Sequence, residues 1–216
     1  FRIENSADFM TPGHQEIELA LVRLYDATGE ERYLKLAEFF VDKRGNNDKD
    51  SVADYGPLVD QSDIPARKLR NVTGHAVRAV YYYCAIADLA GIEKDDELLE
   101  SAKALFDDIY NRKMYITGGI GAVINSETFS AAYHLPNREA YAETCAALGL
   151  ALFASRMYSM IPDGRYGDAA ERALYNGMLS GLSISGDRFF YENPLEINTS
   201  LAAVPNLHQV PLERVK

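Results

Sequence analysis

Cysteine is scarce in this sequence, which contains two in 216 residues, Cys84 and Cys145. Two cysteines at this length do not make the disulfide framework of a small secreted domain. Cys84 lies among apolar residues in AVRAVYYYCAIADLAG, where we expect a small core residue. Cys145 follows the carboxylate of Glu143 by two residues and begins an apolar run, so this cysteine needs a separate explanation.

The sequence also lacks a long apolar run and an excess of basic residues. Its apolar segments are short and interrupted by polar residues, so we expect none to cross a membrane. The net charge is −10, from 22 Lys and Arg against 32 Asp and Glu, and this argues against a nucleic-acid surface, which needs a basic stripe. A neutral ligand fits this balance, although plain solubility explains it equally well.

The two ends carry no start or stop signal. Phe1 is neither an initiator methionine nor part of a signal sequence, and the chain stops at Lys216 without a terminating pattern. We therefore expect a central piece of a longer protein, with an N-terminal and a C-terminal part missing. Because no disulfide pattern is present, the expected compartment is the cytoplasm; a signal lost with the N-terminus would change this to the periplasm or the exterior.

Three stretches repeat a pattern of helix, turn and helix: residues 16–43, 75–113 and 145–179. Each contains a glycine that we expect at the C-terminal cap of its first helix, and these are Gly29, Gly91 and Gly164.

The two helices of a pair differ in character. The first helices of the second and third pairs are apolar nearly all round, so they must be buried on all sides. The second helices are amphipathic. In the second pair the apolar stripe consists of Leu98, Leu99, Ala102, Leu105, Phe106 and Ile109.

This contrast predicts an inner ring of buried helices inside an outer ring of half-exposed ones, which is an all-α (α/α)6 toroid. Three pairs make about half of such a ring, so residues 1–216 are expected to form a partial barrel domain. An open solenoid of helix pairs is the competing architecture. Within residues 181–200, SISGDRFFYENPLEIN has a Gly-Asp turn between β-prone runs and predicts a small β-hairpin.

Polar residues recur where the inner helices should begin. His14 follows TPG, with Thr11 as the expected N-cap, and His75 follows VTG, with Thr73 as the expected N-cap. Glu143 and Cys145 occupy the corresponding region of the third pair. Because parallel inner helices of a toroid open at one rim, we expect these side chains to gather there.

Glu143 and Cys145 can share a site only if the backbone between them is extended. Residues two apart point about 200° away from each other on a helix, but lie on the same side of an extended segment. We therefore expect the AET segment to be non-helical, with Cys145 in the first turn of the following helix. A carboxylate and a thiolate would then make half of a tetrahedral zinc site. In the simpler interpretation, Glu143 is a helix N-terminal acid and Cys145 a core residue.

The loop between the second and third pairs, residues 116–137, is long for a compact protein, and such loops are often functional. Its single acid is Glu127. A lone loop acid is most often simply solvated, but over the same rim Glu127 could donate a proton.

Four segments together resemble the β-L-arabinofuranosidase family of glycoside hydrolases: ITGGIGAVINSETF, HLPNREAYAETCAALGLALFASRMY, ALYNGMLSGLSISGDRFFYENPLE and IPARKLRNVTGHAVRAVYYY. The resemblance extends from about residue 11 to the end of the chain, and it implies the (α/α)6 catalytic barrel of that family.

The resemblance also implies roles for individual residues. Glu127 corresponds to the family's general acid/base, although Ser126 replaces the glycine that precedes it in the family. Glu143 and Cys145 correspond to zinc ligands. His14, His75 and Tyr191 correspond to residues that contact the sugar. The family's nucleophile, a zinc-bound cysteine, and the other cysteine ligands of Zn2+ would follow Lys216, so this piece alone is expected to be inactive.

The implied function is release of terminal β-L-arabinofuranose, or a related sugar, from an oligosaccharide by a retaining mechanism. No nucleic-acid or membrane partner is expected, and the sequence allows a homodimer. Three alternatives stay open: a metal-independent α/α-barrel enzyme with two carboxylates, a non-catalytic sugar-binding relative, and a helical-repeat scaffold.

Overall fold

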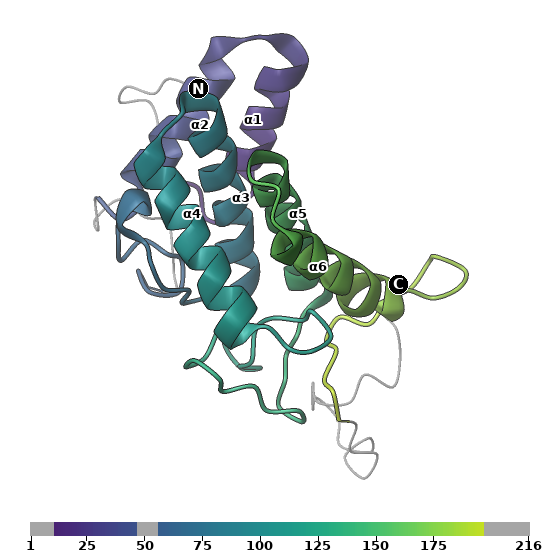
Figure 1. Cartoon of the computed structure of the whole chain (residues 1–216). Coiled ribbons are helices and arrows are strands. Elements are labelled where there is room, and N and C mark those ends of the chain that lie inside the picture. The colour runs from purple at the N-terminus through teal and green to yellow at the C-terminus, as the bar shows by residue number, and fades with distance from the viewer. Residues whose placement is uncertain (1–10, 47–55, 197–216) are drawn as a thin grey trace. The chain divides into compact units, whose positions relative to one another are not determined.

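The computed structural model describes residues 11–46 and 56–196, and six α-helices run through this part of the chain (Figure 1). They are α1 (Ile17–Thr28), α2 (Glu31–Lys43), α3 (Ala76–Glu93), α4 (Asp96–Asp108), α5 (Thr144–Met160) and α6 (Gly164–Arg172). Short 3-10 helices cover Ala66–Lys68 and Leu179–Gly181, and π-helical turns cover Ile109–Lys113 and Ala173–Met178. Within the described residues, β-pairing is limited to isolated bridges, so the expected all-α class is confirmed.

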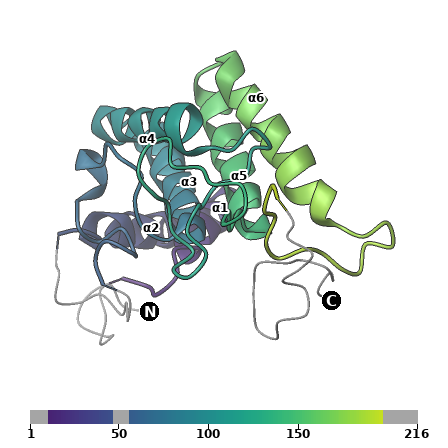
Figure 2. The same cartoon turned by 90° about the horizontal axis from the view of Figure 1, so that it is seen from below.

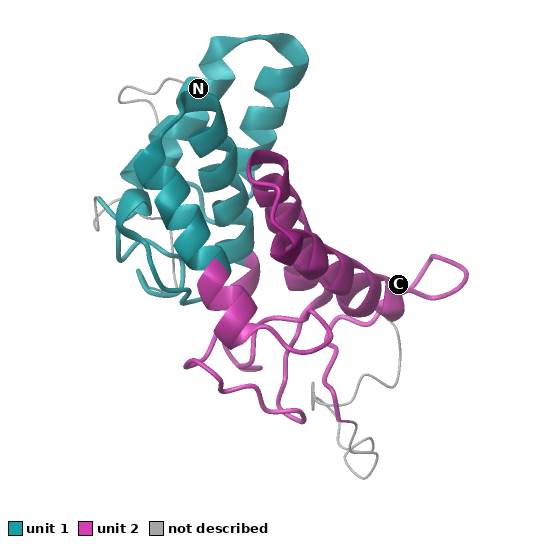
Figure 3. Cartoon of the chain, viewed as in Figure 1, with its two compact units in different colours: residues 1–74, 78–106 teal, residues 75–77, 107–216 magenta. Residues whose placement is uncertain are grey.

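The chain divides into two compact units, each described by itself (Figure 3). Unit 1 is made of residues 1–74 and 78–106, and it contains the pair α1/α2 and most of α3 and α4. Unit 2 is made of residues 75–77 and 107–216, and it contains the long loop before α5 and the pair α5/α6. Among the helices that the structure describes, none has the length and apolar character needed to cross a bilayer.

The turns within the first two pairs use left-handed residues, but only one of them is the expected glycine. Gly29 ends α1 with φ 70°, as predicted. The prediction for Gly91 was wrong, because Gly91 lies inside α3 and the chain turns at Lys94, with φ 55°. The carboxylate of Asp95 then accepts a hydrogen bond from the backbone N–H of Leu98 at 2.9 Å and caps α4.

The prediction for Gly164 was also wrong, because this glycine begins α6 and does not end α5. The helix α5 ends at Met160, and Asp163 is the N-cap of α6. The Asp163 carboxylate accepts a hydrogen bond from the Arg165 N–H at 2.9 Å, so the side-chain cap decides where the helix starts.

The contrast between inner and outer helices is as predicted. Nearly every residue of α3 from Ala76 to Ala90 is buried or half-buried, and Cys84 is fully buried in this run. In α4 and the turn after it, the buried stripe consists of Leu98, Ala102, Leu105, Phe106 and Ile109, while Leu99 is only partly covered. Burial of such stripes is the main apolar contribution to folding.

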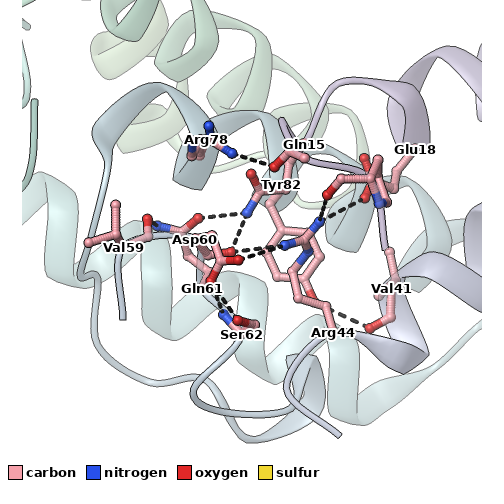
Figure 4. Close-up of polar contacts among 12 residues, drawn as sticks. Gln15, Glu18, Val41, Arg44, Val59, Asp60, Gln61, Ser62, Arg78 and Tyr82 are labelled. Atoms are coloured by element: carbon pink, nitrogen blue, oxygen red, sulfur yellow. Dashed lines mark hydrogen bonds and ion pairs between the residues drawn. The ribbon is translucent and has the colours of Figure 1, made fainter. Parts of the chain in front are cut away.

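Unit 1 encloses a charged network around Arg44, which follows α2 directly (Figure 4). Its side chain is fully buried, with Nη2 at 3.7 Å from Glu18 Oε1 and Nη1 at 3.8 Å from Asp60 Oδ2. The guanidinium also donates to the carbonyls of Asp60, at 3.1 Å, and Pro12, at 2.9 Å, and lies over the ring of Tyr82. Arg44 therefore joins the segment before α1, the helix α1 and the loop around residue 60.

Residues 182–189 form a tight turn with one antiparallel bridge, between Leu182 and Phe189. The N–H of Ser183 donates to the Arg188 carbonyl at 2.8 Å, and Gly186 takes φ 75° at the tip. In Figure 2 this turn projects beyond the end of the α6 segment. Residues 197–200 of the expected hairpin lie outside the described residues.

Candidate active site

Glu127 and His75, which are 52 positions apart in the sequence, are paired in unit 2. His75 Nε2 lies 2.7 Å from Glu127 Oε2. The backbone adds a second link, because the N–H of Ala76 donates to the Glu127 carbonyl at 2.8 Å. The first N–H groups of a helix have no partner inside it, so the loop satisfies the start of α3. Thr73, expected as the N-cap, lies outside this helix, which begins at Ala76.

Glu127 lies in a short hairpin turn and has a strained backbone conformation. Val123 and Thr128 exchange backbone hydrogen bonds of 3.1 and 3.3 Å, and Glu127 itself takes φ 55°. A positive φ is uncommon outside glycine, and such strain is often found at functional sites. Ser126 lies with its Oγ 2.9 Å from Thr128 Oγ1. The Glu127 side chain stays 38% exposed and can meet a ligand.

The backbone of Glu143 and Cys145 is arranged largely as their spacing predicts, but Thr144, which was expected to be non-helical, is the first residue of α5. Glu143 is extended, with φ −61° and ψ 138°, and it occupies the N-cap position of α5. The helix begins at Thr144, so Cys145 lies in its first turn. The Cys145 thiol is close enough to the Glu143 carboxylate for a hydrogen bond. The two side chains therefore lie together.

The segment around Tyr191 holds the start of α5 in place. The N–H of Thr144 donates to the Tyr191 carbonyl at 3.0 Å, and Thr144 Oγ1 donates to the Phe190 carbonyl. Asn193 Nδ2 donates to the Ala142 carbonyl and to Thr144 Oγ1, both at 3.0 Å. These bonds satisfy backbone groups at the start of α5 that have no partner within the helix, and they bring Tyr191 next to Glu143.

The Glu143 carboxylate is electrostatically unusual. Its burial raises its pKa, hydrogen bonds from Cys145 and Tyr191 lower it, and the nearby charge of Glu127 raises it. Burial is the largest of these causes because a charged group loses its hydration there.

The same carboxylate has an unused acceptor. Glu143 is 3% exposed, and its Oε2 is buried without a hydrogen-bond partner in the described part of the chain. An unsatisfied buried oxygen beside a thiol is a donor pair that suits Zn2+. No cluster of three or more His, Cys, Asp or Glu side chains suited to a metal occurs among the described residues. These residues therefore fit part of a metal site, and zinc binding stays a prediction.

Two tyrosines, Tyr141 and Tyr191, lie near these residues, and Tyr141 was not predicted from the sequence. The rings of Tyr141 and Tyr191 meet edge to face, with centroids 6.3 Å apart. Burial, followed by the charge of Glu143, raises the pKa of Tyr191 to about 12, and the same two causes raise the pKa of Tyr141. Glu127 adds a smaller contribution to the raised pKa of Tyr141. Simple alternation along the chain could not have identified Tyr141, because Ala142, which lies between Tyr141 and Glu143, takes a left-handed φ of 40°.

His14 lies in unit 1, whereas the other five predicted site residues lie in unit 2. It sits in the turn before α1, with Nδ1 3.6 Å from Glu16 Oε1. The expected N-cap Thr11 was wrong, because α1 begins at Ile17 and Glu16 occupies the cap position. Each unit is described by itself, so the meeting of His14 with the other site residues stays a prediction.

Comparison with protein families identifies the chain. A family described as "Beta-L-arabinofuranosidase, GH127 catalytic domain" matches residues 2–209. The chain belongs to the GH127 family.

The GH127 relatives are considerably longer than this chain. The non-reducing end β-L-arabinofuranosidase of Bifidobacterium longum subsp. longum is 37% identical over 218 residues, which cover 94% of this chain and 33% of that protein. The chain therefore spans about a third of the length of this curated relative.

Two solved GH127 structures are also similar. The β-L-arabinofuranosidase of Geobacillus stearothermophilus T6 is 40% identical with a TM-score of 0.88, over 99% of this chain and 36% of that one. A second GH127 β-arabinofuranosidase is 45% identical with a TM-score of 0.80, over 86% of this chain and 28% of that one. These similarities confirm that the chain has the fold class of a partial α/α barrel.

Proposed function

We propose that this chain is part of the catalytic domain of a retaining glycoside hydrolase that releases terminal β-L-arabinofuranose, or a closely related sugar. The observation that carries the proposal is the pairing of Glu127 with His75 at 2.7 Å, in the same unit as Glu143 and Cys145. Membership of GH127 and the printed activity of its relatives support the choice of sugar.

Glu127 is the proposed general acid/base. Retention requires a proton donor for the leaving oxygen and a nucleophile at the anomeric carbon. The half-exposed Glu127 carboxyl would protonate the leaving group and later take a proton from the incoming water. His75 would hold that carboxyl in position, and the nucleophile would be a cysteine of the parent protein that follows Lys216.

Glu143 and Cys145 are the proposed zinc ligands of this chain. Support comes from the buried Glu143 Oε2, which lacks a hydrogen-bond partner among the described residues, and from the adjacent thiol. Zinc, when bound, would keep its thiolate ligands deprotonated at neutral pH. The bonds from Thr144 to the segment around Tyr191 would keep both ligand side chains in register.

His14, His75 and Tyr191 are the proposed sugar contacts. Imidazole and phenol groups provide directional donors and acceptors, which suit a furanose ring with several hydroxyls. Tyr191 is exposed enough, at 42%, to meet a ligand, and burial together with the nearby charge of Glu143 raises its pKa. His75 would contact the sugar from the side of Glu127.

The experiment uses the full-length parent protein and an aryl β-L-arabinofuranoside. Glu127→Gln should keep the protein folded and its zinc content unchanged, while turnover falls by about 10²- to 10⁴-fold. Glu139→Gln is the matched control, because Glu139 is an exposed acid of the same unit and should lose nothing. Full activity of Glu127→Gln would remove Glu127 from its role. Full activity without any bound zinc would favour a metal-independent enzyme with two carboxylates. Sugar binding without turnover would favour a non-catalytic relative.

A further inference from the structure

The turn that carries His14 is fixed by distant residues of unit 1. The cap position of α1 makes no side-chain hydrogen bond that would define the start of the helix. Instead, the Pro12 carbonyl accepts a hydrogen bond from Arg44 Nη2 at 2.9 Å, and the Gly13 carbonyl accepts one from Arg78 Nη1. The position of this turn therefore depends on tertiary contacts rather than on a local cap.

Gln15, the residue after His14, is joined to Gln61 by a buried hydrogen bond between the two side chains (Figure 4). The bond is 2.8 Å long, and both side chains are almost completely shielded from water. Gln15 Nε2 donates to Gln61 Oε1 and also to the Asp60 carbonyl. Because its nitrogen faces two acceptors, the Gln15 amide has one defined orientation.

The Gln61 amide is also bonded on its other side. Its Nε2 donates to the carbonyls of Val59 and Thr73, each at 3.0 Å, so the amide oxygen must face Gln15. The backbone of Gln61 takes φ 59°, which a residue other than glycine keeps only where its surroundings impose it. A Cβ at position 74 would lie 2.6 Å from Gln61 Nε2, so Gly74 leaves the room that this amide needs. Gln61 is therefore a fixed amide that offers its oxygen to Gln15.

We propose that Gln61 is a positioning residue that keeps His14 where it can contact the terminal sugar. This inference rests on the proposed function, in which His14 is a sugar contact. The connection runs from the Gln61 oxygen through the Gln15 amide to the neighbouring imidazole, which is 35% exposed. Without this bond the turn would populate positions in which the imidazole is displaced, and only the remaining fraction of the protein would bind the sugar.

Gln61→Met in the full-length protein, with an aryl β-L-arabinofuranoside as substrate, tests the proposal. Methionine keeps most of the side-chain volume and removes the amide. A neutral hydrogen bond changes an equilibrium by about 3- to 10-fold, and the apparent affinity falls with the fraction of competent protein. KM should therefore rise by about 3- to 10-fold. The value of kcat should stay within about twofold, because the groups that carry out the chemistry are unchanged.

Gln15→Met breaks the same hydrogen bond from the other end. It leaves the bonds of Gln61 to Val59 and Thr73 in place, and it should raise KM by a similar factor. This variant decides the question if Gln61→Met does not fold.

Ser101→Ala is the matched control. Ser101 is equally buried in unit 1, and its hydroxyl donates to the Ala66 carbonyl at 2.7 Å. A purely structural role of a buried polar side chain should lower the midpoint of urea unfolding in all these variants and leave KM unchanged. We expect Ser101→Ala to show only the change in stability.

The double variant His14→Ala/Gln61→Met decides whether Gln61 acts through His14. The proposal expects its KM to be no higher than that of His14→Ala. It is overturned if KM is unchanged in Gln61→Met and Gln15→Met, if Ser101→Ala raises KM equally, or if the two rises multiply. An active wild type whose KM rises in His14→Ala but not in Gln61→Met would overturn only the role of Gln61. An inactive wild type, or an unchanged KM in His14→Ala, would overturn the sugar contact of the proposed function and this inference with it.

Discussion

Arg44→Met should be one of the most destabilising single substitutions in unit 1. Arg44 is fully buried, and its guanidinium is close to two carboxylates, those of Glu18 and Asp60, that are themselves buried. Removing the cation leaves both acids in a medium that cannot hydrate them. Breaking a buried pair in this way costs about 3–5 kcal/mol. Methionine keeps most of the side-chain volume, so the loss should come mainly from the charges.

Arg67→Met is the matched control for that prediction. Arg67 also pairs with two acids, through Nη1 to Asp42 at 2.5 Å and through Nε to Asp95 at 2.8 Å, but it is 37% exposed. Solvent screens these pairs, so the expected loss is about 1 kcal/mol or less. Urea unfolding of the full-length protein, with the midpoint and slope of the transition of each variant, measures both losses. Equal losses for the two variants would refute the reasoning.

The penalty of Arg44→Met should also depend on pH. Burial raises the pKa of Glu18 above 4.5, and the charge of Arg44 partly offsets this. A raised pKa of an acid means that the folded state holds its proton more tightly than the unfolded state. Its contribution to stability is therefore present below about pH 4.5 and is lost as pH rises through the folded-state pKa. Without Arg44 that pKa should rise further, so the penalty should be larger at pH 8 than at pH 5. A penalty that does not change with pH would contradict this.

Other predictions concern unit 2. A Cβ on Gly177 would lie 2.6 Å from the Cβ of Ala147, so Gly177→Ala should cost about 1–3 kcal/mol, and adding Ala147→Gly should restore part of it. If urea unfolding shows that the stability changes of Gly177→Ala and Ala147→Gly simply add in the double variant, the contact between these two positions is excluded. Removing zinc from the full-length protein with a chelator should let iodoacetamide label the half-buried Cys145, while the fully buried Cys84 stays unlabelled. Peptide mass spectrometry measures this, and labelling of Cys145 that is equally fast before chelation would argue against its role as a ligand.

Local patterns in the sequence were sufficient to predict the helix pairs. The period of the apolar residues identified all three helix pairs, and it identified which helix of the second pair is buried all round. The helix ends were less predictable, because a left-handed cap can fall on any residue that tertiary packing places there. Lys94 takes that conformation and Gly91 does not, and Asp163 starts a helix at the glycine that was expected to end one.

The sequence by itself also predicted that the chain is extended at Glu143 and that Cys145 lies in the first turn of the following helix, because the start of a helix is a local property. Only the tertiary structure decided that Glu127 meets His75, and that the ring of Tyr141 meets the ring of Tyr191. These partners come from loops whose path depends on backbone hydrogen bonds to distant segments, such as Ala76 to Glu127 and Thr144 to Tyr191. The buried acids that pair with Arg44 could not be predicted from the sequence either, since no periodicity indicates which distant acid will lie next to a buried base.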